Sequence, residues 1–432
     1  MSLLRSVAAK SRHAYECLVA AQKAHAKWEY EVSSFILSRR WKLLLALLVP
    51  VIVFVGLDLA FAADLPASLG GKKAYMPSFA TMDMFLFSIL IGLAAGLITG
   101  CIGAGGGFIL TPALMSIGVK GIMSVGTDQF HIFAKAMMGT AVHRKLGNVS
   151  IPLAVCFVVG SFCGVTLGGI VNRGIYEKSP ALSDAFISAV YVFMLGFLGA
   201  YALYDYLRLR RGESTGAQVQ TTTSVARALQ AANIPPKVRF DEDVVPGGRS
   251  ISIYPVIVCG FIVGFVAAIM GVGGGFLTFP MFVYGLGVST FTTVGTDILQ
   301  IIFTAGYASI FQYAIYGFVF YTIAMGMLVG SLVGIQIGAL TTKLVKGSMI
   351  RGFYAVVILA GFMNRAFALP GRLASAGYVE MSKSTSQALD LAGLVIFFVL
   401  VGIFAVWVLV SFFRGLGQIR AGAIGESAGV GH

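Results

Sequence analysis

The residues with the clearest capacity for chemistry are polar side chains set inside apolar sequence. Asp128, His131 and Lys135 are spaced i, i+3 and i+7, so a helix would carry them on one face. Ionisable groups within a membrane are costly, and they are usually functional or paired. Lys135 and His131 could attract an anion, and Asp128 could cap a nearby helix start or carry a coupling proton. A structural ion pair involving Asp128 would also account for the pattern.

A related set follows 169 residues later, where Asp297 and Gln300 occupy the places of Asp128 and His131. We assign these four residues to one candidate coupling set. Gly-Thr precedes each aspartate, so the threonines at 127 and 296 are candidate hydroxyl donors to a ligand. A Thr-Asp pair ahead of an apolar run is also an ordinary N-cap arrangement.

Both sets lie downstream of a glycine cluster that occurs twice. The copies read Gly-Ala-Gly-Gly-Gly-Phe at 103–108 and Gly-Val-Gly-Gly-Gly-Phe at 271–276. Each Gly costs a helix interior about 1 kcal/mol relative to Ala, so the clusters predict breaks in apolar helices. The exposed N–H groups and the positive end of the following half-helix could bind a small anion. Close helix packing is the alternative use of such glycines.

The candidate substrate-binding residues are Gly103, Gly105, Gly106, Gly107, Phe108, Thr127, Lys135, Gly271, Gly273, Gly274, Gly275, Phe276 and Thr296.

The similarity between the two copies extends well beyond these motifs. Residues 85–173 recur as 254–343 with two single-residue slips; Gly92, for example, precedes Gly260 by 168 residues. Five membrane crossings separate equivalent points of the copies. Because five is odd, we expect the second copy to be inverted in the membrane, as in many secondary transporters.

The composition predicts the medium in which the helices fold. The chain of 432 residues is 57% hydrophobic and only 11% charged, and its mean hydropathy is +0.88. Such a chain is typical of an all-α, polytopic integral membrane protein. The net charge of +13 gathers in loops and at the N-terminus, where the positive-inside rule explains it better than nucleic-acid binding does. The five cysteines include no CxxC pair, so they indicate neither a disulfide framework nor a zinc site.

The apolar runs predict about ten to twelve spans, counting the short glycine-rich segments. We divide the chain into a basic amphipathic segment (1–40), a signal-anchor span (41–63), a first transmembrane repeat (84–207), a flexible cytoplasmic linker (208–250) and a second transmembrane repeat (252–413). The basic clusters at the ends of the spans all lie on one side, which predicts that both termini are cytoplasmic.

Motifs for catalysis or cofactor binding are missing from the sequence. Neither glycine cluster is followed by the Gly-Lys-Ser/Thr of a nucleotide loop, and no HExxH or Ser/His/Asp order occurs. We therefore expect no enzymatic activity, no cofactor and no metal.

The doubled GxGGGF-x₃-P motif, followed at short distance by Gly-Thr and a polar residue, resembles the TauE/SafE family of membrane transporters, which are sulfite exporter-like. The resemblance covers about 85–210 and 254–412. It implies secondary transport of a sulfur-containing oxyanion, sulfite or an organosulfonate, across the bacterial inner membrane. Many members have Ser where this chain has Asp128 and Asp297, which adds two carboxylates near the implied site.

The sequence thus predicts export by alternating access around a central site, with coupling to an ion gradient. The expected partners are a small anion and the lipid bilayer, without nucleic acid, and homo-oligomer formation is left open. Two alternatives remain. One is cation-coupled uptake of the same anions, and the other is a membrane sensor or assembly factor that binds without transport.

Overall fold

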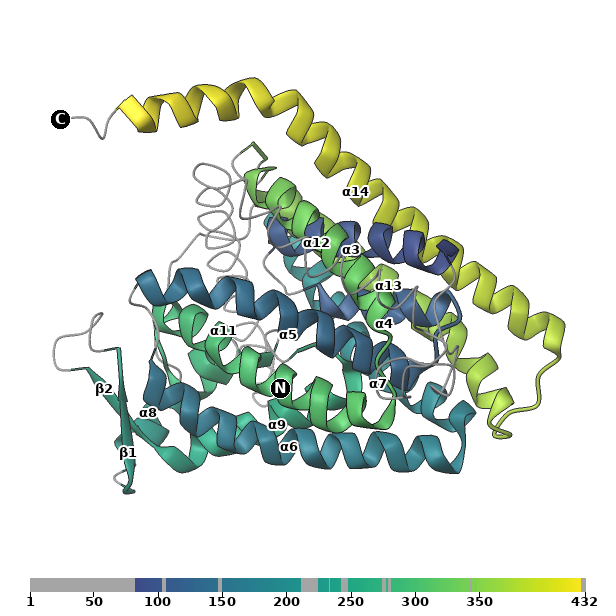
Figure 1. Ribbon diagram of the computed structural model, residues 1–432, viewed down its shortest axis with the longest axis horizontal. Helices are drawn as coiled ribbons and strands as arrows, with labels where there is room; N and C mark the ends of the chain where they lie inside the picture. Colours follow the sequence, from purple (N-terminus) through teal and green to yellow (C-terminus); the bar gives the residue numbers. More distant parts are fainter. Residues whose placement is uncertain are drawn as a thin grey trace.

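A computed structural model describes residues 82–102, 106–146, 150–210, 224–232, 234–241, 248–273, 277–278, 281–341, 344–345 and 347–428. The segments predicted at 1–40 and 41–63 lie outside these residues. The described part is almost entirely helical (Figure 1).

The helices fall into two series that follow the sequence repeat. The first series is α3 (Met82–Ile102), α4 (Gly107–Ser116), α5 (Gly121–Leu146), α6 (Ile151–Lys178) and α7 (Pro180–Arg210). The second is α9 (Ile253–Met270), the π-helical turn η2 (Met281–Leu286), α11 (Thr290–Tyr307), α12 (Tyr321–Thr341) and α13 (Gly347–Ser375). The π-helical η3 (Ala308–Tyr313) and the 3₁₀ turn η4 (Ala314–Tyr316) extend α11, and α14 (Lys383–Ala428) runs along the outer edge of the bundle (Figure 1).

Eight helices in the described part of the chain are long and apolar enough to cross a membrane: α3, α6, α7, α9, α11 with its extension, α12, α13 and α14. This confirms the predicted all-α, polytopic membrane fold. α5 is 26 residues long but carries Asp128, His131 and Lys135, and it is not among the eight. The larger predicted total also counted the short glycine-rich segments and the span at 41–63.

The second repeat is inverted relative to the first, as predicted. The equivalent helices α5 and α11 lie together, with Gly126 against Tyr313 and, further along α5, Phe133 against Gly306. The residue numbers rise along one helix and fall along the other, so the two helices are antiparallel. The equivalent pair α7 and α13 shows the same order. Repeats whose matching helices are antiparallel are related by a two-fold axis in the membrane plane.

The remaining helices pair across the repeats along two glycine interfaces. The two helix pairs are α3 with α12 and α6 with α9 (Figure 1). In the first, Gly92, Gly96 and Gly100 of α3 meet Gly330, Gly334 and Gly338 of α12. In the second, Gly160 and Gly164 of α6 lie against the backbone of Ile257 and Phe261 of α9, and Gly260 and Gly264 of α9 lie against the backbone of Phe157 and Ser161 of α6.

The contacts in the two glycine interfaces are symmetric. A Cβ atom at Gly96 would lie 2.5 Å from the carbonyl oxygen of Ser331. At the equivalent position of the second repeat, a Cβ atom at Gly264 would overlap the carbonyl oxygen of Ser161, which is the equivalent of Ser331. The glycines shared by the two repeats therefore allow one backbone to touch another, which is a major source of helix association in a membrane.

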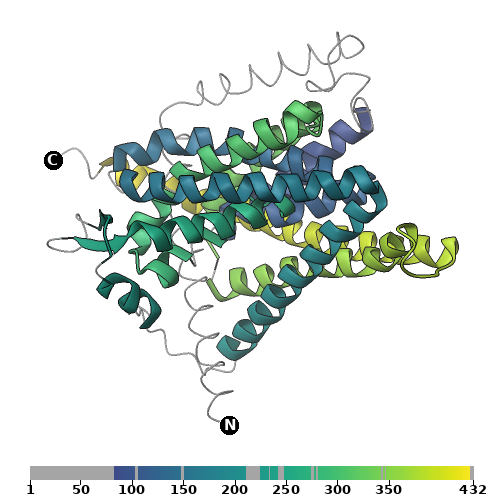
Figure 2. The same ribbon diagram turned by 90° about the horizontal axis from the view of Figure 1, so that it is seen from below.

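The range 208–250, predicted as a flexible linker, contains α8 (Ser224–Ala231) and the strand β1 (Lys237–Phe240), and β2 (Arg249–Ser252) follows at its end. β1 and β2 pair antiparallel, and this hairpin and α8 lie at one end of the bundle (Figure 2). Val238 and Phe240 alternate with exposed residues and are buried in one cluster with Phe157 of α6 and Phe282 of η2, so the strand packs against both repeats. This packing gives the segment a fixed contact with the membrane domain.

The glycine interfaces can be tested by adding one methyl group. We expect Gly164→Ala to destabilise the protein by about 1–3 kcal/mol, because its Cβ would overlap the carbonyl oxygen of Phe261 and force two backbones apart. Gly174→Ala, in the same helix, is the matched control, since nothing lies within 4 Å of its Cβ. Thermal unfolding of the purified protein in one detergent measures both. Equal unfolding temperatures for the two variants would contradict the close backbone contact.

Candidate functional site

The glycine motifs of the two repeats meet at the centre of the bundle. Gly107, at the start of α4, lies against Val272, and a Cβ there would be 3.1 Å from the Val272 Cα. Gly273 lies against Ile132 of α5 in the same way. The motif residues Gly103, Gly105, Gly274, Gly275 and Phe276 lie outside the described residues. The described parts of the two motifs form one contact region between the repeats.

The described glycines break the helices at these positions, as the sequence predicted. Gly106 has a φ of 55° and precedes α4, and Gly271 has a φ of 80° and ends α9. Residues other than Gly seldom adopt this left-handed conformation. A Cβ at Gly106 would also lie 2.6 Å from the Thr99 hydroxyl oxygen. Phe108 follows as a fully buried side chain, with its ring edge-on to Tyr354 at a centroid distance of 6.3 Å.

Asp128 and His131 form a buried pair with one free atom each. Thr111 of α4 donates a hydrogen bond to Asp128 Oδ2 at 3.1 Å, and His131 Nε2 lies 2.9 Å from Ser331 Oγ on α12. Asp128 Oδ1 and His131 Nδ1 are 3.9 Å apart, and neither has a hydrogen-bond partner among the described residues. This distance is too long for a hydrogen bond. A small movement would bring the two atoms into a contact that can share a proton.

The equivalent residues of the second repeat form a closed network. Gln300 donates from Nε2 to Asp297 Oδ1 at 2.8 Å and to Thr278 Oγ1 at 3.1 Å. The hydroxyl of Thr304 donates to Gln300 Oε1 at 2.8 Å and lies 2.8 Å from Ser161 Oγ. The two repeats therefore match in backbone position but differ in hydrogen bonding.

Thr127 and Thr296 connect each repeat to the other. Thr127 Oγ1 accepts a hydrogen bond from the N–H of Phe320 at 2.9 Å, and Thr296 Oγ1 accepts one from Ser150 at 3.0 Å. Phe320 and Ser150 immediately precede α12 and α6. The alternative that each threonine caps its own helix is wrong, because both lie inside helices that begin at Gly121 and Thr290. Instead, each binds at the start of a helix of the opposite repeat.

Lys135 is partly buried on α5, two turns after Asp128, and it lies within electrostatic range of both Asp128 and His131. The predicted helical face that carries the three residues is therefore present. Among the described residues, no group of three or more His, Cys, Asp and Glu side chains could hold a metal ion.

Two buried residues around the motifs were missed by the sequence analysis. Tyr191 of α7 is fully buried and donates to the Met270 carbonyl oxygen, next to Gly271, at 2.5 Å. Arg365 of α13 is 1% exposed. Arg365 had a usable signal, since it is an ionisable residue inside a predicted span, whereas Tyr191 had none.

The family model described as Sulfite exporter TauE/SafE matches residues 88–364, which include both glycine motifs and Asp128 and Asp297. The chain belongs to the TauE/SafE family of multi-pass membrane transporters. The match ends before α14 and leaves residues 1–87 outside.

Relatives of this TauE/SafE protein occur in distant prokaryotes. The chain is 26% identical to "Probable membrane transporter protein YjnA" of Bacillus subtilis over 58% of its own length and 87% of the relative. It is 23% identical to a "Probable membrane transporter protein" of Xylella fastidiosa over 65% of its own length and 94% of the relative. It is 24% identical to "Probable membrane transporter protein MJ0441" of Methanocaldococcus jannaschii over 45% of its own length and 59% of the relative. No solved structure matches the chain significantly.

The threonine contacts can be tested at Thr127. Thr127→Val removes the acceptor and leaves the Phe320 N–H buried without a partner, which costs about 1–3 kcal/mol. Thr127→Ser keeps the hydroxyl and is the matched control. We expect thermal unfolding in detergent to show a lower midpoint for the valine variant than for the serine variant. If the two variants unfold together, this hydrogen bond does not hold the repeats.

Proposed function

We propose that this TauE/SafE protein is a secondary transporter that exports a small sulfur-containing oxyanion, sulfite or an organosulfonate, by alternating access and coupled to an ion gradient. The observation that supports this most directly is the contact between the two glycine motifs, in which Gly107 lies against Val272. In transporters with inverted repeats, broken helices meet at the repeat interface and bind the substrate near the bilayer midplane.

The start of α4 suits an anion. Its N-cap residue is Gly106, which provides no side-chain cap, and the Ile109 N–H bonds to the Gly106 carbonyl oxygen. We assign the N–H groups of Gly107 and Phe108, the first two of the helix, to a ligand. The positive end of the helix dipole lies at the same point. We assign substrate contact to this helix start, to the glycines of the second motif and to Lys135, which adds a full positive charge. Thr127 and Thr296 hold the surrounding helices in place.

The coupling role falls to Asp128 and His131. Their free atoms, Oδ1 and Nδ1, are buried 3.9 Å apart, beside the contact between the motifs. A proton on this pair would remove the charge of the carboxylate, which otherwise repels an anion. Asp297 is bonded to Gln300, and we assign this second pair to the stability of the second repeat.

The proposed orientation follows from the basic clusters at the ends of the spans. These predict that both termini lie in the cytoplasm and that the turn between α6 and α7 lies on the opposite, external side of the inner membrane. The glycine interfaces are tight backbone contacts, so α3 with α12, and α6 with α9, would move as rigid pairs during alternating access.

The first test concerns the helix break. Gly106→Leu places a side chain at a φ of 55° and against the Thr99 hydroxyl, so the start of α4 must move. We expect flux of radiolabelled sulfite into proteoliposomes to fall by about tenfold or more, equivalent to about 1.4 kcal/mol or more. Gly174→Leu is the control, because its Cβ meets no other atom. Absence of sulfite and sulfonate flux in the correctly inserted unmodified protein would refute the transport proposal and favour a sensor.

The second test concerns coupling. Asp128→Asn cannot exchange a proton, so we expect sulfite flux to lose its acceleration by an imposed pH gradient while flux down the sulfite gradient persists. Asp297→Asn is the matched change in the second repeat and should retain the acceleration. The same assay on both variants compares flux with and without the pH gradient. Retained acceleration in Asp128→Asn would remove this residue from the coupling role.

A further inference from the structure

Arg365 is a buried cation with an unused donor. Its Nε donates to Asn364 Oδ1 at 2.8 Å, and its Nη2 donates to Ser116 Oγ at 2.9 Å and to the Pro112 carbonyl oxygen at 3.3 Å. Nη1 is also buried, and it has no hydrogen-bond partner in the described part of the chain. The guanidinium therefore keeps free N–H groups inside the protein.

The partners of Arg365 do not neutralise it. All three acceptors are uncharged oxygen atoms, and no ion pair joins Arg365 to a carboxylate of the described residues. The carbonyl end of α4, near Ser116, offers only the partial negative charge of a helix terminus. Asp390 and Asp184 act on this charge only from a distance, and burying an incompletely compensated charge costs several kcal/mol. Joining α4 to α13 would need only Nε and Nη2, so the free donor and the excess charge point to an anionic ligand.

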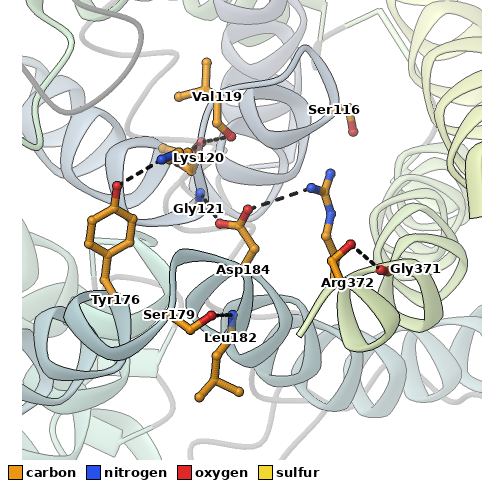
Figure 3. Close-up of polar contacts among 12 residues, drawn as sticks. Ser116, Val119, Lys120, Gly121, Tyr176, Ser179, Leu182, Asp184, Gly371 and Arg372 are labelled. Atoms are coloured by element: carbon orange, nitrogen blue, oxygen red, sulfur yellow. Dashed lines mark hydrogen bonds and ion pairs between the residues drawn. The ribbon is translucent and has the colours of Figure 1, made fainter. Parts of the chain in front are cut away.

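Arg372 lies two turns further along the same face of α13. Its side chain is 31% exposed, and its buried Nε has no hydrogen-bond partner among the residues described. Its Nη1 forms an ion pair with Asp184 Oδ2 at 3.8 Å, a distance too long for a hydrogen bond. Asp184 also accepts the N–H of Gly121 at 2.7 Å, so this carboxylate caps α5 (Figure 3). Arg372 thus continues the line of free donors from Arg365 toward the surface.

The charges around this line are positive on balance. The cations are Arg365, Arg372 and Lys120, which donates to the Tyr176 hydroxyl at 3.2 Å (Figure 3). The carboxylates are Asp184 and Asp390, and Asp390 of α14 lies within electrostatic range of Arg365. Three cations against two carboxylates leave room for an anion.

The inner end of the line reaches the glycine motifs. Asp184, Ser188 and Tyr191 are spaced i, i+4 and i+7, so they share one face of α7. Ser188 Oγ is buried without a partner in the described part, and Tyr191 is bonded to the carbonyl oxygen before Gly271. Arg365 lies within electrostatic range of both Tyr191 and Arg372. Polar groups therefore connect the surface at Arg372 to the centre.

We propose that Arg365, with Arg372, forms a second oxyanion-binding site between the glycine motifs and the face of the membrane where α6 meets α7. The planar guanidinium can bind two oxygen atoms of one oxyanion through parallel N–H donors. In the orientation proposed above, this site lies on the exit path. The inference rests on the proposed transport of an anion and adds a binding step to it.

The test uses the full-length chain in proteoliposomes, with sulfite as the probe applied from either side. Arg365→Gln keeps hydrogen-bonding capacity but removes the charge and the paired N–H donors. We expect the sulfite concentration for half-maximal flux to rise about tenfold when sulfite is applied from the α6–α7 face, and to change little from the other face. Arg365→Lys keeps the charge without the paired donors. Its sulfite concentration for half-maximal flux should therefore lie between those of the unmodified protein and of Arg365→Gln.

Arg173→Gln is the matched control, because Arg173 is also buried but donates to the carbonyl oxygen and side chain of Gln312. It should not change the concentration for half-maximal flux from the α6–α7 face. Should Arg365→Gln fail to fold, Arg372→Gln replaces it, with a smaller increase expected from that face alone.

The outcomes separate the two proposals. Transport by the unmodified protein with unchanged half-saturation in Arg365→Gln, or in Arg372→Gln where that variant replaces it, overturns the second site alone. An equal increase from both faces also overturns it, since it would indicate a general structural effect. Absence of flux in the unmodified protein, together with no effect of sulfite on its thermal unfolding, refutes both the transport function and the second site.

Discussion

Direct contact between helix backbones is the interaction on which this structure depends. Along the two glycine interfaces, residues such as Gly96 and Gly264 bring one helix against the carbonyl groups of another from the opposite repeat. Lipid supplies no hydrophobic force to hold helices together, so close packing must do so. Because α3 is fixed to α12 and α9 to α6, the motifs that follow α3 and α9 are brought to the interface between the repeats. The candidate site is thus a consequence of the packing.

The backbone symmetry does not extend to the polar groups. Asp128 keeps a free oxygen atom, whereas Asp297 is bonded within a network. The helix starts differ as well. Asp184 of α7 accepts the N–H of Gly121 at the start of α5, while Asp241, next to β1, accepts that of Ser289 before α11. One end of the bundle is therefore covered by the β-hairpin, and the other carries the arginine pair. The two repeats are therefore similar in backbone but place different polar groups at the two ends of the bundle.

Much of the fold could be predicted because it follows from glycine spacing, which repeats at a nearly constant offset. The shared face of Asp128 and His131 followed from their spacing along one helix. Contacts between distant residues could not be found in this way. Thr127 binds the N–H of Phe320, and spacing says nothing about a backbone partner 193 residues away. The short strand Lys237–Phe240 was hidden in a polar stretch, since four alternating residues resemble a loop.

The free groups at the centre and near the surface have opposite effects on an anion. In the proposed function, Arg365 attracts the anion with the unpaired donors of Nη1, whereas an ionised Asp128 repels it from the glycine motifs. In the cycle proposed above, an anion in the centre is favoured when Asp128 holds a proton, and loss of that proton favours movement toward Arg365. Binding of the proton at Asp128 and binding of the anion at the motifs would then be coupled electrostatically, without direct contact between the two. The asymmetry between the repeats supplies this proposed link. Asp128 Oδ1 has no hydrogen-bond partner among the described residues, whereas the equivalent Asp297 Oδ1 accepts a hydrogen bond from Gln300.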